Sequence, residues 1–378
     1  MIAALQRIDS DAAVVLADER GKHLLSMNAD RSMIPASIIK IVIVQAAYDL
    51  LGRDFRFKTE FYLNSDGTLT IKGWGDPFLI SEEIAIITRQ LADEGLTRVK
   101  QLRLDNSAFS EDVTIPGTSN SLNPYDALNG ALVVNFNTLF VGKGRDGKIY
   151  SAEEHTPLTP LAASKALHLP PGHEERINLT DNPAESLEYA GQLFAALMRV
   201  HNITIDHPAV LSAETDEKRS LLLRHFNSKS LDEIFSGLMK YSNNYIANQV
   251  FLVIGAEQAG YPASLETSRA VLKDYLKQRW GFASGEIHMD EASGISRLNR
   301  MTARQMMAIL ETFRENSDLL SGPKGLKIKS GTLTGVYNYA GYFQSPSGLR
   351  PFVIMTENRV NRRDQLLKEL RHFSDNHQ

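Results

Sequence analysis

The alternation of apolar and polar residues predicts a central helix with strands near it. Residues 12–17 and 23–27 form two strand-like runs joined by a glycine turn, and residues 38–51 follow as a helix that ends at Gly52. This helix is apolar nearly all round, which is typical of a helix buried in the middle of its domain. We therefore expect it to form part of a hydrophobic core.

Between about residues 55 and 219 the pattern changes to short alternating runs separated by Gly, Pro, Ser and Asn clusters, which favour strands and turns. Helical periodicity then returns, and three strand-like runs and a charged helix end the chain. The strands expected in the middle region are 59–63, 68–72, 99–104 and 131–141, and its helices are 82–95 and 184–201. The later helices are 230–240, 245–255, 264–280, 302–316 and 361–373, and the later strands are 326–335, 337–344 and 351–357.

These elements predict a mixed α/β (α+β) protein with two domains. The two ends of the chain, residues 1–53 and 219–378, build one discontinuous domain of strands and helices. Residues 54–218 form an inserted, β-rich accessory domain. The length of 378 residues fits two or three domains of about 150 residues each.

Composition excludes several classes of protein. The chain has no cysteine, so a thiol nucleophile, a thiolate metal site and a disulfide framework are impossible. Its formal charge of −4 argues against a general nucleic-acid binder. No apolar stretch approaches the ~20 residues of a membrane span, and the first residues lack the features of a signal peptide. We expect a soluble chain, either cytosolic or with its leader removed.

Two sequence patterns that can indicate a bound cofactor or metal, a G-x-G-x-x-G match and the histidines, do not have the neighbouring residues that such a site needs. Residues 142–147 fit G-x-G-x-x-G, but residues 148–150 continue as a strand where a dinucleotide fingerprint must open a helix. We predict a hairpin loop there. The histidines form no H-E-x-x-H motif, and His201 and His207 have no acidic residue at metal-ligand spacing. We therefore expect neither a metal nor a cofactor.

The first candidate for catalysis is the S-x-x-K motif of Ser37 and Lys40 at the start of the predicted central helix. Residues at i and i+3 share one face of a helix. An apolar neighbourhood disfavours the charged ammonium, so it lowers the pKa of Lys40 and lets this lysine accept the serine proton. The helix N-terminus adds N–H groups for a developing oxyanion. The alternative is a helix-capping serine beside a solvated lysine.

The second candidate is the S-x-N motif of Ser242 and Asn244. It lies between two predicted helices, where a short loop can direct a hydroxyl and an amide into a cleft. The alternative is helix capping, a common role for Ser and Asn.

The third candidate is Lys329-Ser330-Gly331-Thr332, inside a strand-like run near the C-terminus. Lys and Gly are both disfavoured in strand interiors, so their presence calls for a reason. Gly331 would let a substrate backbone approach closely, and Lys329 would supply a fixed positive charge. The alternative is an edge strand that a lysine protects from aggregation.

Together the three motifs resemble those of the penicillin-interacting serine acyl-enzymes, in which S-x-x-K, S-x-N and K-[ST]-G converge on one cleft. The long separation between Ser37 and Ser242 resembles the large insertion of the D-alanyl-D-alanine carboxypeptidase/endopeptidase family, peptidase family S13, a low-molecular-mass class C group of penicillin-binding proteins. Other stretches are similar to that family as well. They are PASIIK at 35–40, GWGDP at 73–77, VVNFNTLFV at 133–141, ASGISRLN at 292–299 and KSGTLTGVYNYAGY at 329–342.

The resemblance implies a β-lactamase/DD-peptidase-like transpeptidase domain with an antiparallel sheet flanked by helices. It implies a serine D-Ala-D-Ala carboxypeptidase, with endopeptidase activity as a further option, that acts on peptidoglycan stem peptides without a cofactor. β-Lactam antibiotics would be covalent inhibitors. Because this substrate lies outside the cytoplasmic membrane, we expect a periplasmic or otherwise extracytoplasmic location, with an export signal that this chain lacks.

The resemblance also implies a role for each motif residue. Ser37 would be the acylated nucleophile and Lys40 its general base. Ser242 would relay a proton to the leaving D-alanine, and Asn244 would hold the amide on the acyl side. The oxyanion would face the N–H groups of Ser37 and Thr332. The residues expected to bind the substrate are Lys329, Ser330, Gly331 and Thr332 at its terminal carboxylate and Arg297 at its peptide side chain.

Two alternatives stay open on the same scaffold. A class A β-lactamase needs a deacylating Glu in an E-x-x-x-N context after S-x-N, whereas Glu60 and Glu174 fit this pattern but precede Ser242. A catalytically silent penicillin-binding module would keep the fold without turnover. Labelling with a fluorescent penicillin, followed by the decay of the label, separates these readings.

Overall fold

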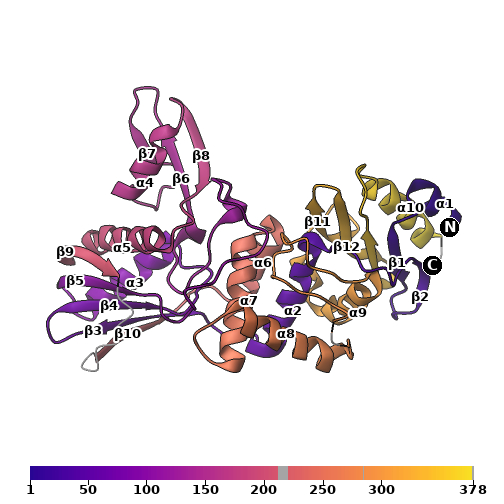
Figure 1. The fold of residues 1–378 in the computed structure, drawn as a ribbon, viewed down its shortest axis with the longest axis horizontal. Helices are drawn as coiled ribbons and strands as arrows, with labels where there is room; N and C mark the ends of the chain where they lie inside the picture. Colours follow the sequence, from indigo (N-terminus) through magenta and orange to yellow (C-terminus); the bar gives the residue numbers. More distant parts are fainter. Residues whose placement is uncertain (212–219, 284, 377–378) are drawn as a thin grey trace. The chain divides into compact units, whose positions relative to one another are not determined.

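The computed structural model describes residues 1–211, 220–283 and 285–376, which form two compact units. Unit 1 comprises Met1–Arg53, Asp232–Ala247 and Ser268–Gln378, so it holds both ends of the chain. Unit 2 comprises Asp54–Leu231 and Asn248–Thr267. Figure 1 draws the ribbon in colours that follow the sequence, and the sheet of unit 1 combines indigo strands from the N-terminal region with yellow strands from the C-terminal region.

This division differs from the predicted one at its second boundary, residue 218. Strand β10 (Ser220–Phe226) pairs antiparallel with β3 (Lys58–Leu63), so residues up to Leu231 group with unit 2. Residues 248–267 do so as well. Pairing between strands that are far apart in the sequence sets this boundary, so the local pattern of residues does not predict its position. The catalytic and accessory roles of the two parts stay predictions.

Unit 1 contains the expected antiparallel sheet. Its five strands follow the order β11-β12-β13-β1-β2, so strands from opposite ends of the chain are neighbours. Strand β11 is an edge strand. Apart from one bridge between Ser321 and Ile328, it pairs with β12 alone in the described ranges. The strands are β1 (Ala13–Ala17), β2 (His23–Met27), β11 (Leu326–Leu333), β12 (Val336–Ser345) and β13 (Gly348–Met355).

Helices cover both faces of this sheet. On one face, Leu5 of α1 (Ile2–Ile8) and Leu366 of α10 (Arg363–Asp375) share a buried cluster with Phe343. The residue before Phe343, Tyr342, points to the other face of the sheet, because neighbouring residues of a strand alternate between its two faces. There its hydroxyl donates to the carbonyl of Leu310 in α9 (Ala303–Phe313) at 2.6 Å. The result is a helix–sheet–helix sandwich, in which α1 was not predicted.

The predicted central helix is confirmed. Helix α2 (Lys40–Leu51) is buried from Lys40 through Tyr48, packs against α9, and ends at Gly52 with φ 84°. A short 3₁₀ turn, Ala36–Ile39, leads into it. The remaining helices near this region are α6 (Leu231–Tyr241), α7 (Asn244–Ala259) and α8 (Leu265–Trp280).

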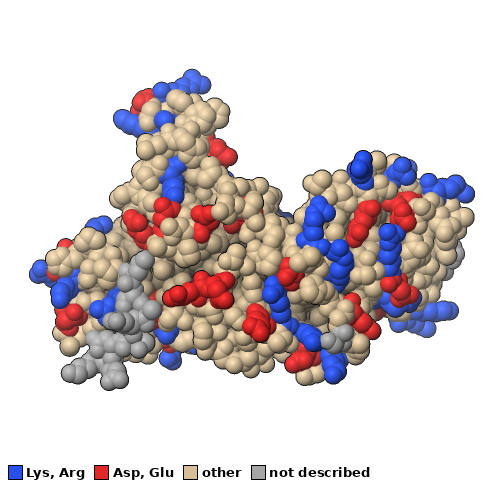
Figure 2. Space-filling model, viewed as in Figure 1, with Lys and Arg blue, Asp and Glu red and all other residues tan. Residues whose placement is uncertain are grey.

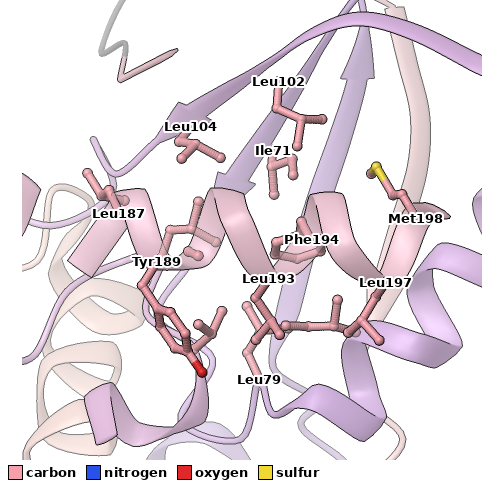
Figure 3. Packing of buried hydrophobic residues seen from close by; sticks show 14 of the residues in the cluster. Ile71, Leu79, Leu102, Leu104, Leu187, Tyr189, Leu193, Phe194, Leu197 and Met198 are labelled. Carbon is pink, nitrogen blue, oxygen red and sulfur yellow. The ribbon is translucent and has the colours of Figure 1, made fainter. Parts of the chain in front are cut away.

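Unit 2 is built on a mixed sheet of order β10-β3-β4-β5-β9, with parallel pairing of β4 with β5 and of β5 with β9. Figure 3 shows Leu193, Phe194 and Leu197 of α5 packed beside Ile71 and Leu102 of the sheet. A smaller sheet has the order β7-β6-β8, and its β6–β7 hairpin confirms the loop predicted at 142–147. The elements are α3 (Ser81–Asp93), α4 (Pro160–Lys165), α5 (Pro183–Val200), β4 (Thr68–Gly73), β5 (Arg98–Asp105), β6 (Thr138–Lys143), β7 (Ile149–Ser151), β8 (His173–Asn178) and β9 (Thr204–Leu211).

The predicted strand at 131–141 is wrong in its first half. Strand β6 begins only at Thr138, because Asn135, Phe136 and Asn137 all have positive φ angles of 49–60°. This turn places the Asn135 side chain where its Oδ1 accepts the N–H of Ser81 at 2.9 Å. Asn135 thus caps α3 from a distant part of the chain, an interaction that alternation in the sequence does not reveal.

The surface carries charges of both signs. Figure 2 shows Lys and Arg side chains interspersed with Asp and Glu over the face that it draws. In the described part of the chain, every helix is too short or too polar to span a lipid bilayer.

Candidate active site

The first site element lies at the junction of the 3₁₀ turn and α2, where Lys40 is completely buried. Its Nζ is 2.9 Å from Ser37 Oγ, 2.9 Å from Asn244 Oδ1 and 2.5 Å from the carbonyl oxygen of Ser293. The amide and carbonyl oxygens only accept hydrogen bonds. A neutral amine with two N–H groups therefore satisfies both and directs its lone pair at the Ser37 hydroxyl.

Electrostatics favour that neutral form of Lys40. Burial lowers its pKa well below the ordinary value for lysine, and the positive charge of Lys329 lowers it further. The carboxylate of Glu291 acts in the opposite direction. The lysine next to Ser37 is therefore suited to accept a proton.

The second site element joins Ser242 to Lys329. Ser242 lies between α6 and α7 with φ 54°, a conformation that is uncommon for a residue other than glycine. Lys329 Nζ donates to Ser242 Oγ at 2.8 Å, and burial lowers the pKa of Lys329 to about 8. Most Lys329 side chains are therefore protonated at pH 7. A protonated lysine can only donate, which leaves the Ser242 hydrogen available to another group.

Two glycines let main-chain segments close around the Ser37 turn. A Cβ atom at Gly294 would lie 2.1 Å from the carbonyl oxygen of Ala36, and one at Gly331 would lie 2.7 Å from that of Pro35 and 3.1 Å from Ser37 N. No side chain fits in either place. The position of Ser37 therefore depends on direct contact between main-chain segments. This contact explains why the third residue of the K-S-G-T motif is a glycine.

Sequence reasoning missed Glu291, which is fully buried. Its carboxylate accepts five hydrogen bonds: from the N–H and hydroxyl of Ser293, the N–H groups of Gly294 and Ser296, and the Asn299 amide. These bonds fold the loop that presents the Ser293 carbonyl to Lys40. A buried acidic residue directly before a Gly/Ser loop is a weak signal, and it becomes specific only when the loop is seen around it.

The remaining predicted residues lie outside this cluster. Ser330 and Thr332 are exposed on β11, and by strand alternation their side chains leave it on the opposite face from Lys329 and Gly331. Arg297 donates to the carbonyl of Thr334 at 2.5 Å, at the turn between β11 and β12. The structure thus forms two hydrogen-bonded groups, one of Lys40 with Ser37 and Asn244 and one of Lys329 with Ser242.

The glutamates that fit the E-x-x-x-N pattern of a deacylating residue form hydrogen bonds with groups other than Ser37 and Lys40. Glu60 accepts hydrogen bonds from Arg224 and Trp74 in unit 2, and Glu174 accepts the Tyr150 hydroxyl. A further match, Glu357, follows Ser242 in the chain, and its carboxylate accepts the N–H of Ile34 at 2.5 Å. In the described ranges, none of the three makes a hydrogen bond to Ser37 or Lys40.

A serine beside a buried lysine, a second serine–lysine pair and an adjacent edge strand together form the arrangement of an S-x-x-K serine acyl-enzyme. Comparisons with known proteins identify the family. The model of the D-Ala-D-Ala carboxypeptidase 3 (S13) family matches residues 2–155 and 171–328. The chain belongs to this family.

Individual relatives are distant in sequence but similar over most of their length. The D-alanyl-D-alanine carboxypeptidase DacB of Haemophilus influenzae is 25% identical over 391 residues, which cover 85% of this chain and 79% of that protein. The crystal structure of penicillin binding protein 4 (dacB) from the same organism matches with a TM-score of 0.75 at 20% identity, covering 95% of this chain and 94% of the other. The structure of that protein complexed with a novel β-lactam matches with a TM-score of 0.72 at 20% identity, covering 95% and 93%.

Proposed function

We propose that this protein is a serine-type D-Ala-D-Ala carboxypeptidase that removes the terminal D-alanine from peptidoglycan stem peptides through an acyl-enzyme on Ser37. The observation that carries the proposal is that the completely buried Lys40 Nζ lies 2.9 Å from Ser37 Oγ while two other oxygen acceptors, Asn244 Oδ1 and the Ser293 carbonyl, can take its N–H groups. Family membership and the named activity of the Haemophilus influenzae relative support the choice of substrate. Because that substrate is extracytoplasmic, we place the protein outside the cytoplasmic membrane.

In the acylation step, Ser37 Oγ attacks the carbonyl carbon of the bond between the two D-alanines, and Lys40 takes the hydroxyl proton. The oxyanion is held by the N–H groups of Ser37 and Thr332. As the C–N bond breaks, Ser242 passes a proton to the leaving amine, and Lys329 next to it stabilises the charge. Water then attacks the ester, and the acid product leaves with Ser37 restored.

Recognition of a free carboxyl end follows from the cations near β11. Ser330 and Thr332 present hydroxyls on the exposed face of this edge strand, where they can donate to a carboxylate, and Lys329, buried on the other face, contributes its positive charge without touching the same face. A carboxylate attracts a positive charge and accepts hydrogen bonds from hydroxyls. Asn244 holds the amide of the acyl part, and Arg297 contacts the peptide side chain.

β-Lactams fit the same proposal, because they combine an acylating carbonyl with a carboxylate. The relative from Haemophilus influenzae has been seen complexed with a β-lactam. We propose that penicillins acylate this chain at Ser37 and that the adduct hydrolyses slowly. Fast loss of the label would instead indicate the β-lactamase alternative, and absence of labelling in the folded wild type would indicate a silent module.

The test is covalent labelling of the Ser37→Ala variant with a fluorescent penicillin, followed by intact-protein mass spectrometry. We expect complete loss of labelling with an unchanged circular dichroism spectrum, since Ser37 lies beside Lys40, the lysine whose pKa is held well below its usual value and which can therefore accept the serine proton. Ser321→Ala is the matched control, because Ser321-Gly322-Pro323-Lys324 also fits S-x-x-K but is exposed, and its Gly-Pro centre cannot form a helix. An adduct on Ser242 would contradict the assignment of the nucleophile.

A further inference from the structure

An arginine outside the three motifs contacts the K-S-G-T segment. Arg363 is the first residue of α10, and its Nη1 donates to Thr332 Oγ1 at 2.7 Å and to the Gly331 carbonyl at 3.3 Å. Its guanidinium lies over the ring of Tyr339, 4.5 Å from the centroid. Arg363 therefore approaches β11 from the face opposite to Lys329.

The contact fixes the direction in which Thr332 can donate. A hydroxyl has one hydrogen and two lone pairs. Because Thr332 Oγ1 accepts a hydrogen bond from Arg363, its own hydrogen is available to an acceptor at the exposed edge of β11. The terminal carboxylate of a substrate is such an acceptor, and the positive charge of Arg363 lies one hydrogen bond behind it.

The contacts of Arg363 with Tyr339, Thr332 and Gly331 leave its charge without an anionic partner among the described residues. Its Nε is buried without a partner, and none of its hydrogen bonds among the described residues is to a carboxylate. A cation in the first turn of a helix is also opposed by the helix dipole. An unpaired, partly buried cation attracts an anion from solution more strongly than one that is already neutralised.

We propose that Arg363 is a specificity-determining residue for the free carboxyl end of the substrate. It holds the Thr332 hydroxyl as a donor and adds a second positive charge to that of Lys329. Carboxylate recognition would thus be shared between a lysine within the motif and an arginine 31 residues beyond Thr332. This inference rests on the proposed carboxypeptidase function.

The experiment compares Arg363→Gln and Arg363→Lys with wild type on two substrates, an acyl-D-Ala-D-Ala peptide and an uncharged activated thioester. For Arg363→Gln we expect kcat/KM to fall about tenfold on the peptide, through KM, and to stay within about twofold on the thioester. Arg363→Lys keeps the charge and should recover part of the loss. The matched control is Arg362→Gln, which removes the neighbouring arginine that donates to the Ile8 carbonyl.

Other outcomes are also decisive. Equal losses on both substrates for Arg363→Gln and Arg363→Lys would overturn the proposal, because they would indicate that Arg363 only supports β11. Unchanged kinetics on both substrates would overturn it too. If Arg363→Gln does not fold, the test relies on Arg363→Lys. Its ratio of kcat/KM on the peptide to kcat/KM on the thioester then decides whether Arg363 contributes to carboxylate recognition. Failure of the proposed function is distinct, since the wild type itself would then hydrolyse neither substrate and acquire no penicillin label.

Discussion

The two units both bury charged side chains but treat them in opposite ways. In unit 2, Glu83 of α3 and His225 of β10 lie 2.5 Å apart, each with a side chain 3% exposed. Burial alone would raise the pKa of Glu83, but hydrogen bonds from His225 and Ser228 outweigh it and hold this pKa below its usual value. Hydrogen bonds from His225 and Ser228 satisfy the buried Glu83 carboxylate, so this pair is a structural element.

Unit 1 instead buries two lysines, and the positive charge of Lys329 disfavours a second positive charge on Lys40. Lys329 lowers the pKa of Lys40, and the amino group of each lysine forms a hydrogen bond with a serine hydroxyl. Ser242 and Ala36 near them have positive φ angles, so the backbone is strained as well. The burial of an ionisable side chain is therefore not by itself a sign of a reactive site. In unit 1 a lysine held neutral, a serine hydroxyl beside it and positive-φ backbone occur together.

The largest effect that would sharpen this contrast is expected at Lys40. Lys40→Ala removes general-base assistance, so acylation should slow by ~10²–10⁴ on the peptide and on the uncharged thioester alike. Lys40→Arg should not restore the rate, because arginine stays protonated. Stopped-flow acylation measures both, with Lys324→Ala of the exposed S-x-x-K match as control. A Lys40→Ala variant that reacts at the wild-type rate would remove Lys40 from the mechanism.

A smaller effect, on stability alone, is expected in unit 2. Glu83→Gln removes a buried carboxylate that accepts hydrogen bonds from His225 and Ser228, so it should lower the free energy of unfolding by about 3 kcal/mol, while thioester acylation at native conditions stays unchanged. Trp74 lies in unit 2 and Trp280 in unit 1, so denaturation in a Trp280→Phe background follows unit 2 by fluorescence. Glu82→Gln, at the exposed neighbouring position, is the control. If Glu83→Gln lost acylation without losing stability, Glu83 would contribute to catalysis, and the contrast between a structural pair in unit 2 and a reactive site in unit 1 would be wrong.

The smallest effect concerns the charge of Lys329. With a pKa of about 8, this lysine is positive below pH 8 and loses its charge as the pH rises through that value. The ratio of kcat/KM for the peptide to that for the uncharged thioester should therefore fall severalfold between about pH 7 and 9. Lys329→Arg should keep part of the activity and abolish this pH dependence. Equal losses on both substrates for Lys329→Arg would contradict its role in carboxylate binding.

Much of the site was predictable because its motifs are local. Ser37 and Lys40 lie one helical turn apart, and the break between α6 and α7 marks Ser242, so each motif carries its own structural context. Glu291 and Arg363 were not predictable in this way. They act through long-range contacts, with the Ser293 loop and with Thr332, that no periodicity encodes.

The fold shows the same limit. The apolar pattern of α2 and the alternation of β12 and β13 predicted those elements, because burial on known faces requires those residues. The three left-handed residues from Asn135 to Asn137 and the pairing of β10 with β3 were missed, because tertiary contacts there override the local preference.

The two glycine contacts around Ser37 also bear on when the protein becomes reactive during folding. Ser37 is 256 residues from Ser293, whose loop packs on the Ser37 turn, and the segment containing Gly331 follows still later. Such distant contacts form late, because long loops must close first. A chain that is still incomplete or unfolded carries the serine without the surroundings that activate it. We therefore expect Ser37 to stay unreactive until the Ser293 loop and the Gly331 segment have packed on its turn.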